Sequence, residues 1–277
     1  CETVRRQLVP RLSIIMPVHQ PHASYLTLAL SSLIVASPRD SEIHIGLDGA
    51  CDETCLQILV NLQRSVATPK VRISELKRQG LVATLNQLIR DSDCDYIARH
   101  DADDVCLPDR LENQLNALES QPESGFCGTQ ITRCNPRLIP NRLQRHYPSD
   151  FNGQLLYASL MNNPIAHPTL MLRREILGSS AYRNLPGTED WDLYIRLWEE
   201  GYRSFNLKQS GLLYRSHPGQ ITKRKRDFKL IDDLKERSLR AATLHQPLYR
   251  YLKVIQKASN ASRATILMMQ AKTILDQ

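Results

Sequence analysis

Residues 95–104 read Asp-Tyr-Ile-Ala-Arg-His-Asp-Ala-Asp-Asp, and this stretch decides the fold class of the 277-residue chain. The short apolar run at 95–100 predicts a buried β-strand that leads directly into the acidic turn 101–104. In open α/β sheets, ligands bind outside the carboxyl ends of the strands. Carboxylates at such an end therefore predict a ligand site at the edge of a mostly parallel sheet.

The residues before this stretch alternate short apolar runs with longer amphipathic segments, which is typical of a parallel sheet flanked by helices. Strands are predicted at 12–17, 42–47 and 70–76, and helices at 25–36, 53–66 and 82–90. After the acidic turn, Pro108 is expected to open a helix that continues to Leu118, because the first helical position tolerates a residue without an N–H group. The fold class is therefore α/β.

The second half of the sequence is less regular. Residues 133–148 are rich in Pro, Asn and Arg and predict a long loop, a candidate lid. Strands are expected at 167–173 and 212–216. Thr188 is expected to N-cap a helix that runs from Glu189 to about residue 201.

Beyond residue 219, helices are expected at about 226–244 and 247–275. We interpret the segment 223–277 as a basic helical appendage and residues 1–222 as one α/β domain. This division assigns the acidic strand ends to the domain and most of the positive charge to its C-terminal neighbour.

The net charge of +7 is uneven, because residues 203–257 carry fourteen Lys or Arg against four Asp or Glu. This balance indicates either an anionic partner, such as a membrane surface, a lipid phosphate or nucleic acid, or a solvated helix face. No apolar run approaches the ~20 residues that cross a bilayer, and no secretory signal is recognisable. The seven scattered cysteines form no Cys-x-x-Cys pair, which predicts free thiols in a reducing compartment. We therefore expect a cytoplasmic protein that can lie peripherally on the inner face of the cell membrane.

Polar or acidic turns follow three predicted strands, at 18–20, 48–52 and 101–104. No Gly-x-Gly-x-x-Gly or Walker lysine motif accompanies them, which disfavours dinucleotide oxidoreduction and P-loop chemistry. Carboxylates in place of glycines imply a diphosphate held through a divalent ion, which can neutralise the charge of a leaving nucleoside diphosphate. An Asp-x-Asp turn alone is equally typical of solvated surface, so its place directly after a buried strand matters.

Five motifs occur in order along the chain: Ser-Ile-Ile-Met-Pro-Val at 13–18, Asp-Gly-Ala-Cys-Asp-Glu-Thr at 48–54, Gln-Gly-Leu at 79–81 with Asn86, Asp-Ala-Asp-Asp at 101–104 with Pro-Asp-Arg at 108–110, and Thr-Glu-Asp-Trp-Asp-Leu at 188–193. With these motifs the chain resembles the family 2 glycosyltransferases over about Leu12 to Thr222, especially bacterial enzymes that build capsule, exopolysaccharide or lipopolysaccharide. The resemblance implies the Rossmann-like GT-A fold. It also implies a nucleotide-sugar-binding half at about 10–130 and an acceptor-side half at about 131–222.

The resemblance implies roles for residues on the nucleotide side. Pro17 and Val18 would lie along the nucleoside, and Asp48 would accept a hydrogen bond from the base, usually uracil. Leu47 stands where the family more often has a second acid. Gly80 would permit close approach of the backbone to the nucleotide.

Around the diphosphate, the resemblance implies that Asp101 contacts the ribose or sugar of the donor and that Asp103 ligates Mn²⁺ or Mg²⁺. Ala102 would lie between them in the same site. Asp101 is a further candidate metal ligand. His217 is another, because its imidazole near the diphosphate could complete the coordination shell. Asp104 is expected to support the turn.

Asp190 is the candidate general base, which would take the proton of the acceptor hydroxyl as that oxygen attacks the anomeric carbon. At the start of a helix, the helix dipole is expected to hold this carboxylate ionised. Attack opposite the departing diphosphate would invert the anomeric centre. The alternative is that Glu189, Asp190 and Asp192 only charge the first turn of a helix.

Four residues near these motifs are expected to be structural. Trp191 and Trp198 lie on one helical face and predict core packing, and Asn86 reads as an ordinary residue of a helix surface. His167 resembles a family segment that lines the acceptor side, although a structural histidine at a strand start is favoured.

The predicted function is therefore transfer of a sugar from a nucleotide diphosphate sugar, with a UDP-sugar as the family's usual donor, to a hydroxyl of a glycan or lipid-linked acceptor. One alternative is a sugar-nucleotide pyrophosphorylase, but residues 19–22 lack the Gly-rich loop of such enzymes. Another is a non-catalytic module that binds nucleic acid or membrane through the basic cluster 223–226. No aromatic platform accompanies that cluster, so an anionic membrane surface is the expected partner and nucleic acid is not.

Overall fold

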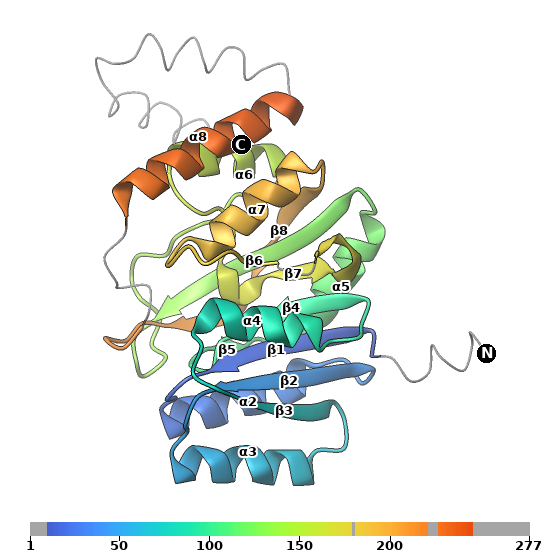
Figure 1. Cartoon of the computed structure of the whole chain (residues 1–277), viewed down its shortest axis with the longest axis vertical. Coiled ribbons are helices and arrows are strands. Elements are labelled where there is room, and N and C mark those ends of the chain that lie inside the picture. The colour runs from blue at the N-terminus through green and yellow to red at the C-terminus, as the bar shows by residue number, and fades with distance from the viewer. Residues whose placement is uncertain (1–9, 179–180, 221–226, 246–277) are drawn as a thin grey trace, which may run out of the picture.

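A computed structural model describes residues 10–178, 181–220 and 227–245 (Figure 1). In chain order, the first elements are β1 (Leu12–Val18), α2 (Ala23–Ala36), β2 (Ser41–Asp48), α3 (Glu53–Ser65), β3 (Lys70–Leu76), α4 (Leu81–Arg90), β4 (Tyr96–Arg99), β5 (Val105–Cys106) and α5 (Arg110–Ser120). The others are β6 (Ser124–Cys134), α6 (Phe151–Leu160), η1 (His167–Thr169), β7 (Met171–Arg173), η2 (Arg174–Ile176), α7 (Glu189–Glu199), β8 (Arg203–Arg215) and α8 (Phe228–His245), where η1 and η2 are short 3₁₀ turns.

The eight strands form one mixed sheet in the order β3-β2-β1-β4-β7-β6-β8-β5. The strands β3, β2, β1 and β4 are mutually parallel. Strands β1, β2 and β4 are buried along almost their whole length, as expected for strands covered on both faces, whereas most residues of the edge strand β3 are partly exposed. Because their carboxyl ends meet at one edge, the end of β1, the end of β2 and the acidic turn after β4 lie side by side. The predicted α/β class and the parallel arrangement of the first four strands are confirmed.

The remaining strands bring a distant segment back to the acidic turn. Strand β7 runs antiparallel to β4 and β6, whereas β8 runs parallel to β6. The short strand β5 follows the acidic turn and pairs with the end of β8, with Val105 opposite Leu213. Residues 215–217 are thereby held against a turn that lies more than a hundred residues earlier.

Each face of the sheet carries its own hydrophobic cluster. Helices α2, α3 and α5 cover one face, and α4, α6, α7 and α8 cover the other (Figure 1). Trp191 and Trp198 are 1% and 0% exposed in the second cluster, which confirms their predicted core packing. Leu234 and Ala241 of α8 are buried in the same cluster, so this helix closes the core above α6 and α7.

The starts of two helices differ from expectation. Pro108 lies outside α5, which begins at Arg110, because Asp109 adopts a left-handed conformation at φ 63° that turns the chain first. Thr188 precedes α7 as predicted, but its hydroxyl donates to the carbonyl of Leu185 at 3.3 Å and does not cap the helix.

Three strands and one helix of the second half also differ. The predicted strand 167–173 is a strand only at 171–173, since Pro168 in η1 lacks the N–H that a ladder requires. The predicted strand 212–216 is only the end of β8. Strand β6 and helix α6 fall where the residues show no clear periodicity. The predicted helix 226–244 is confirmed as α8.

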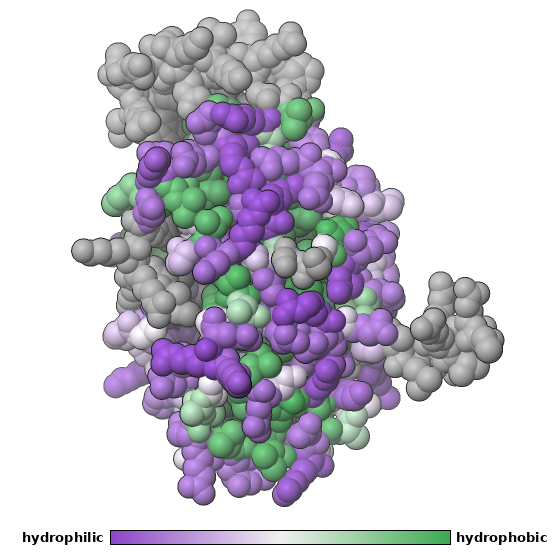
Figure 2. All heavy atoms as spheres, in the orientation of Figure 1, coloured by the Kyte–Doolittle hydropathy of each residue, from purple (hydrophilic) through white to green (hydrophobic). Residues whose placement is uncertain are grey.

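Several further expectations can be compared with the described residues. The six cysteines among them are free thiols, as predicted. None of the described helices combines the length and apolar character that crossing a bilayer requires. On the face shown in Figure 2, hydrophilic side chains are interspersed with small apolar patches. The basic cluster 223–226 and the predicted helix 247–275 lie outside the described residues.

Candidate active site

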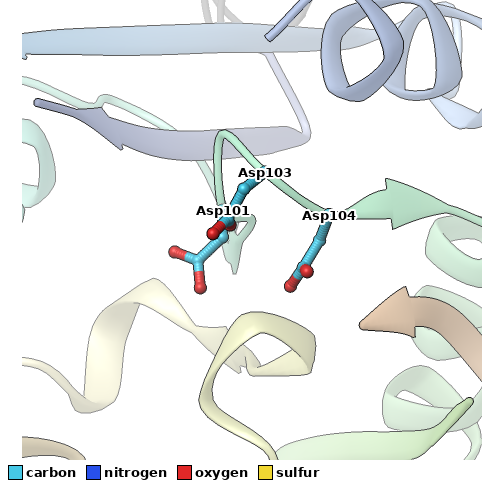
Figure 3. Close-up of side chains that lie close together, drawn as sticks. All are labelled: Asp101, Asp103 and Asp104. Carbon is cyan, nitrogen blue, oxygen red and sulfur yellow. The ribbon is translucent and has the colours of Figure 1, made fainter. Parts of the chain in front are cut away.

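The acidic turn between β4 and β5 gathers three carboxylates. Oxygen atoms of Asp101, Asp103 and Asp104 lie within 4.8 Å of one another. Figure 3 shows the three carboxylates directed to the same side of the turn. Asp101 and Asp103 are partly exposed, Ala102 between them is half-buried, and Asp104 is fully buried. This arrangement presents two accessible acids above a third that solvent does not reach.

The end of β8 holds the acidic turn in place. The backbone N–H of Arg215 donates to Oδ1 of Asp104 at 2.9 Å, and its Nε donates to the carbonyl of Asp103 at 2.8 Å. Nε2 of His217 lies 2.7 Å from Oδ2 of Asp103. The structure thus brings His217, predicted as a metal ligand, to the predicted metal-binding acid. Asp104 supports the turn, as expected, through its bond to Arg215.

Burial raises the pKa of two acids in this turn, Asp101 and Asp104. It raises the pKa of Asp101 to about 6, and the neighbouring charge of Asp103 adds to the effect, while the ion pair with Arg99 opposes it. Burial raises the pKa of Asp104 well above its usual range, with further contributions from Asp103 and Asp101. A divalent cation would favour the ionised forms of all three.

The donor set fits a hard divalent cation such as Mn²⁺ or Mg²⁺. Carboxylate oxygens are the ligands such ions prefer, and an imidazole is acceptable to Mn²⁺. Oδ2 of Asp104 is buried and has no hydrogen-bond partner among the described residues. A buried carboxylate oxygen without a donor is costly, and a cation beside the turn would remove that cost.

A buried arginine supports the turn from below, a role that was not predicted from the sequence. Arg110 is 2% exposed and donates to the carbonyl of Arg99 at 2.9 Å and to Oε1 of Gln114 at 3.0 Å. The third nitrogen of its guanidinium, Nη1, lies 3.2 Å from Nδ1 of His100. Burial lowers the pKa of His100 well below its usual range, so the imidazole is neutral and can accept this bond. The signal in the sequence is the Pro-Asp-Arg motif, which by itself indicates only a helix start.

The predicted nucleotide-side residues lie together at the ends of β1 and β2. Pro17 is half-buried and Val18 is buried. The carboxylate of Asp48 accepts the backbone N–H of Gln79 at 2.6 Å and that of Gly80 at 3.1 Å. Asp48 therefore fixes the loop that leads into α4. Its contact with a base, and those of the other residues here with a nucleotide, stay predictions.

Gly80 adopts φ 88° and ψ 165° at the start of α4, a region open in practice only to glycine. Nothing lies within 4 Å of a Cβ added there, so Gly80→Ala is expected to act through backbone strain alone. We expect the free energy of unfolding to fall by about 1–3 kcal/mol, measured by urea denaturation. Gly178 has equally open surroundings without a positive φ and is the matched control. Equal losses in the two Ala variants would contradict the strain argument.

Asp190 lies in the first turn of α7 and is held by two donors. Its Oδ1 accepts the backbone N–H of Trp191 at 2.8 Å, and its Oδ2 accepts Nδ2 of Asn163 at 2.5 Å. Burial raises the pKa of Asp190 to about 7, and the charge of Glu189 adds to this. The expectation that the helix dipole would hold the group ionised is therefore wrong, because burial outweighs the dipole. A carboxyl with a pKa near neutrality suits proton transfer at physiological pH.

Arg99 connects the acidic turn with Asp190. It forms an ion pair with Asp101, and its positive charge also lowers the pKa of Asp190. Its backbone N–H donates to the carbonyl of Leu170 at 2.8 Å, directly after η1. Nδ1 of His167, the first residue of η1, lies 4.0 Å from Oδ2 of Asp190. Arg99 therefore lies within electrostatic range of both Asp101 in the acidic turn and the candidate base.

A chain of hydrogen bonds secures this side of the site. Asn86 is buried and exchanges two hydrogen bonds with the backbone of Tyr182, at 2.8 and 2.9 Å. The hydroxyl of Tyr182 lies 2.9 Å from Nε2 of His167. The expectation that Asn86 belongs to a helix surface is wrong, because its amide anchors a segment almost a hundred residues away. The structural role favoured for His167 agrees with its buried bond to Tyr182.

A cavity of about 130 Å³ lies next to Asp190. Its wall includes Arg133, Arg145, Tyr147, Asn162, Asn163, His167, Thr188, Trp191, Tyr214 and Ile231. The predicted loop 133–148 contributes to it, and so does α8 through Ile231. A hydroxyl compound in this cavity would have the Asp190 carboxylate within its wall.

Comparison with known proteins shows the family to which the chain belongs. Residues 13–179 match the sequence model of the family described as Glycosyl transferase family 2. The putative glycosyltransferase EpsE of Bacillus subtilis is 28% identical over 79% of this chain and 77% of its own length. The O-antigen biosynthesis glycosyltransferase WbnJ of Escherichia coli is 29% identical over 76% of this chain and 82% of its own.

The fold agrees as well. The structure of the mannosyltransferase PcManGT from Pyrobaculum calidifontis, in complex with GDP-Man and Mn²⁺, superposes with a TM-score of 0.60. The two chains are 17% identical in sequence, and the superposition covers 96% of this chain and 81% of the mannosyltransferase chain. This likeness supports the predicted GT-A fold. With a family match across more than half of its residues, the chain belongs to glycosyl transferase family 2.

Proposed function

We propose that this protein transfers a sugar from a nucleotide diphosphate sugar to a hydroxyl of a glycan or glycolipid, in the biosynthesis of a surface polysaccharide. The observation that carries the proposal is that Arg99 forms an ion pair with Asp101 of the acidic turn and also lies within electrostatic range of the half-buried carboxylate of Asp190. The functions for which the relatives are named, O-antigen biosynthesis among them, support the polysaccharide assignment.

In the proposed reaction, Asp190 accepts the proton of the acceptor hydroxyl. The hydroxyl oxygen forms a bond to the anomeric carbon while the bond from that carbon to the diphosphate breaks, and the electron pair leaves with the diphosphate. A single displacement of this kind inverts the anomeric configuration. Asn163 orients the Asp190 carboxylate through its bond of 2.5 Å.

Asp101 and Asp103 would hold a divalent cation, with His217 as a further ligand and Asp104 behind them. Bound there, Mn²⁺ or Mg²⁺ would neutralise the charge that develops on the departing diphosphate. Nucleotide contacts are proposed for Pro17, Val18, Asp48 and Gly80, which line the neighbouring strand ends. The expected donor is a UDP-sugar. The GDP-Man complex of the similar mannosyltransferase makes a GDP-sugar the second donor to test.

Asp103→Ala is expected to weaken metal-dependent donor binding by more than about 100-fold, beyond the effect of a residue that only supports metal ligands. Isothermal titration of UDP- and GDP-sugars with and without Mn²⁺ measures this loss. Asp93→Ala removes the same charge from an exposed position before β4 and is the matched control. A donor affinity that changes neither when Mn²⁺ is left out nor in the Asp103→Ala variant would refute the proposal. The anomeric configuration of the product, read by NMR, tests inversion.

Contact with an anionic membrane surface at the inner face of the cell membrane stays a prediction from charge. The basic cluster 223–226 that suggests it lies outside the described residues. The pyrophosphorylase alternative loses support, because the family match concerns glycosyl transfer.

A further inference from the structure

Two arginines line the cavity beside Asp190: Arg133 at the end of β6 and Arg145 in the segment that follows, both within the predicted loop 133–148. Arg133 and Arg145 both line the cavity, whereas none of the acids in the turn 101–104 does. The cavity is therefore separate from the place where the proposed cation and diphosphate would bind. Its positive charge calls for an explanation of its own.

The guanidinium of Arg145 is fixed by its neighbours. It lies 4.9 Å from the ring centre of Tyr147 and 5.3 Å from that of Tyr157. Its Nε donates to the hydroxyl of Tyr157 at 2.8 Å, and one terminal nitrogen donates to the carbonyl of Asn163 at 3.0 Å. These bonds use two of its five N–H groups. The side chain is therefore preorganised, with donors still available.

Arg133 is also held with unused donors. Its guanidinium lies 5.2 Å from the ring centre of Tyr214, and its Nε is buried without a hydrogen-bond acceptor among the described residues. Among the described residues, no carboxylate oxygen lies within 4 Å of a guanidinium nitrogen of Arg133 or Arg145. The buried Nε of Arg133 is a cationic donor without a partner, which is costly, and a bound anion would satisfy it.

We propose that this cavity binds an oxyanion of the acceptor, either a carboxylate or a phosphate, close to the hydroxyl that receives the sugar. The inference rests on the proposed function, since it assigns the acceptor's charge at that same site. Arg145 bonds to the backbone of Asn163, whose side chain bonds to Asp190. An anion held by the two guanidiniums would thereby place the adjacent hydroxyl beside the base.

Two sources share this chemistry: a uronic acid within a glycan and the phosphate of a lipid-linked acceptor. A carboxylate is planar and a phosphate is tetrahedral, and a guanidinium can bind two oxygens of either group through two N–H groups. The diphosphate of the donor is a poor occupant, because the acidic turn that would hold it through a cation is absent from the cavity wall.

The test uses the intrinsic fluorescence of the full chain without donor. Trp191 is in the cavity wall, and Trp198, the second of the two tryptophans, is fully buried in the core. The protein is titrated with methyl β-glucuronide, with its neutral counterpart methyl β-glucoside, and with geranyl diphosphate. We expect one anionic probe to bind about tenfold or more tightly than the neutral sugar. The preferred anion identifies the source, and equal affinity for all three would overturn the inference.

Arg133→Gln is expected to weaken binding of the preferred anion by about tenfold, and Arg133→Lys by less, because it keeps the charge. Arg137→Gln removes the same charge from an exposed position in the same loop, outside the cavity wall, and should bind the anion like the wild type. Equal effects of the Arg133→Gln and Arg137→Gln variants would show that only the general charge of the loop matters and would overturn the site.

The outcome is separable from that of the proposed function. Donor binding that depends on Asp103 and Mn²⁺, combined with no preference for an anion, would reject the oxyanion site alone. A preference for an anion that depends on Arg133, without any metal-dependent donor binding, would support the oxyanion site and reject the proposed transferase.

Discussion

Asp190→Asn is expected to lower the rate of sugar transfer by about 10³-fold, within the range that a general base contributes. The amide has nearly the same shape but cannot accept the proton of the acceptor hydroxyl. Donor affinity should stay near that of the wild type, because Asp190 lies beside the cavity and not in the acidic turn. Steady-state transfer at saturating donor, together with titration of the donor, measures both quantities. Transfer at the wild-type rate would exclude Asp190 as the base.

The pH dependence of transfer follows from the raised pKa of the same group. The base acts only when ionised, so the rate should rise with pH and reach half of its maximum near pH 7, given a pKa of about 7. Glu189 contributes to that pKa by charge repulsion. Glu189→Gln should therefore move the rise to lower pH, which separates Asp190 from other titrating groups. A rate that is flat between about pH 5.5 and 8.5 would contradict the assignment.

Asp192→Ala is expected to reduce the free energy of unfolding by about 3 kcal/mol, the lower end of the loss for breaking a buried ion pair. Asp192 is fully buried, and its two oxygens accept Nε of Arg196 at 2.9 Å and a terminal nitrogen of Arg237 at 2.7 Å. Its removal would take this carboxylate from the exposed Arg183, whose Nη1 lies 3.8 Å from Oδ1, and from Arg196 and Arg237 where α7 meets α8. All three side chains keep some contact with water, which limits the loss.

The control for Asp192 is Glu199→Ala, since Glu199 forms a more exposed ion pair with the same Arg237. Exposed pairs contribute up to about 1 kcal/mol, so this variant should be affected far less. Urea denaturation of both variants makes the comparison. Losses of similar size would mean that burial of Asp192 does not determine its contribution.

The parallel half of the fold could be predicted from the sequence because its signals are local. Strands β1, β2 and β4 contain short apolar runs, β3 alternates apolar and polar residues, and the connecting helices lie between them. The acidic turn is recognisable for the same reason, as Asp101 and Asp103 come directly after one such strand. The order of the five motifs along the chain then favours a glycosyltransferase.

The second half depends on contacts that no local pattern records. Strand β6 contains two glycines, which lower strand propensity, and is stabilised by pairing with β7 and β8. Helix α6 has apolar residues on several sides, so no amphipathic stripe identifies it. Asn163 and Tyr182 reach the site through loops, and only tertiary structure reveals their bonds to Asp190 and His167.

The pKa of Asp190 shows why electrostatic properties are hard to predict from sequence. Its position at a helix start is readable and predicts an ionised carboxylate. Burial and the charge of Glu189 act in the opposite direction and dominate. Glu189 is adjacent in the sequence, but the burial of Asp190 depends on neighbours that the fold supplies.

The position of α8 sets a limit on how far the protein can be shortened for expression. A fragment that ends at residue 222 would lose Leu234, Ala241 and Ala242 from the core and Ile231 from the cavity wall. The apolar surface of α6 and α7 that they cover would then face water, and such surface promotes aggregation. Cloning boundaries that keep Phe228–His245 retain both the packed core and the complete cavity wall.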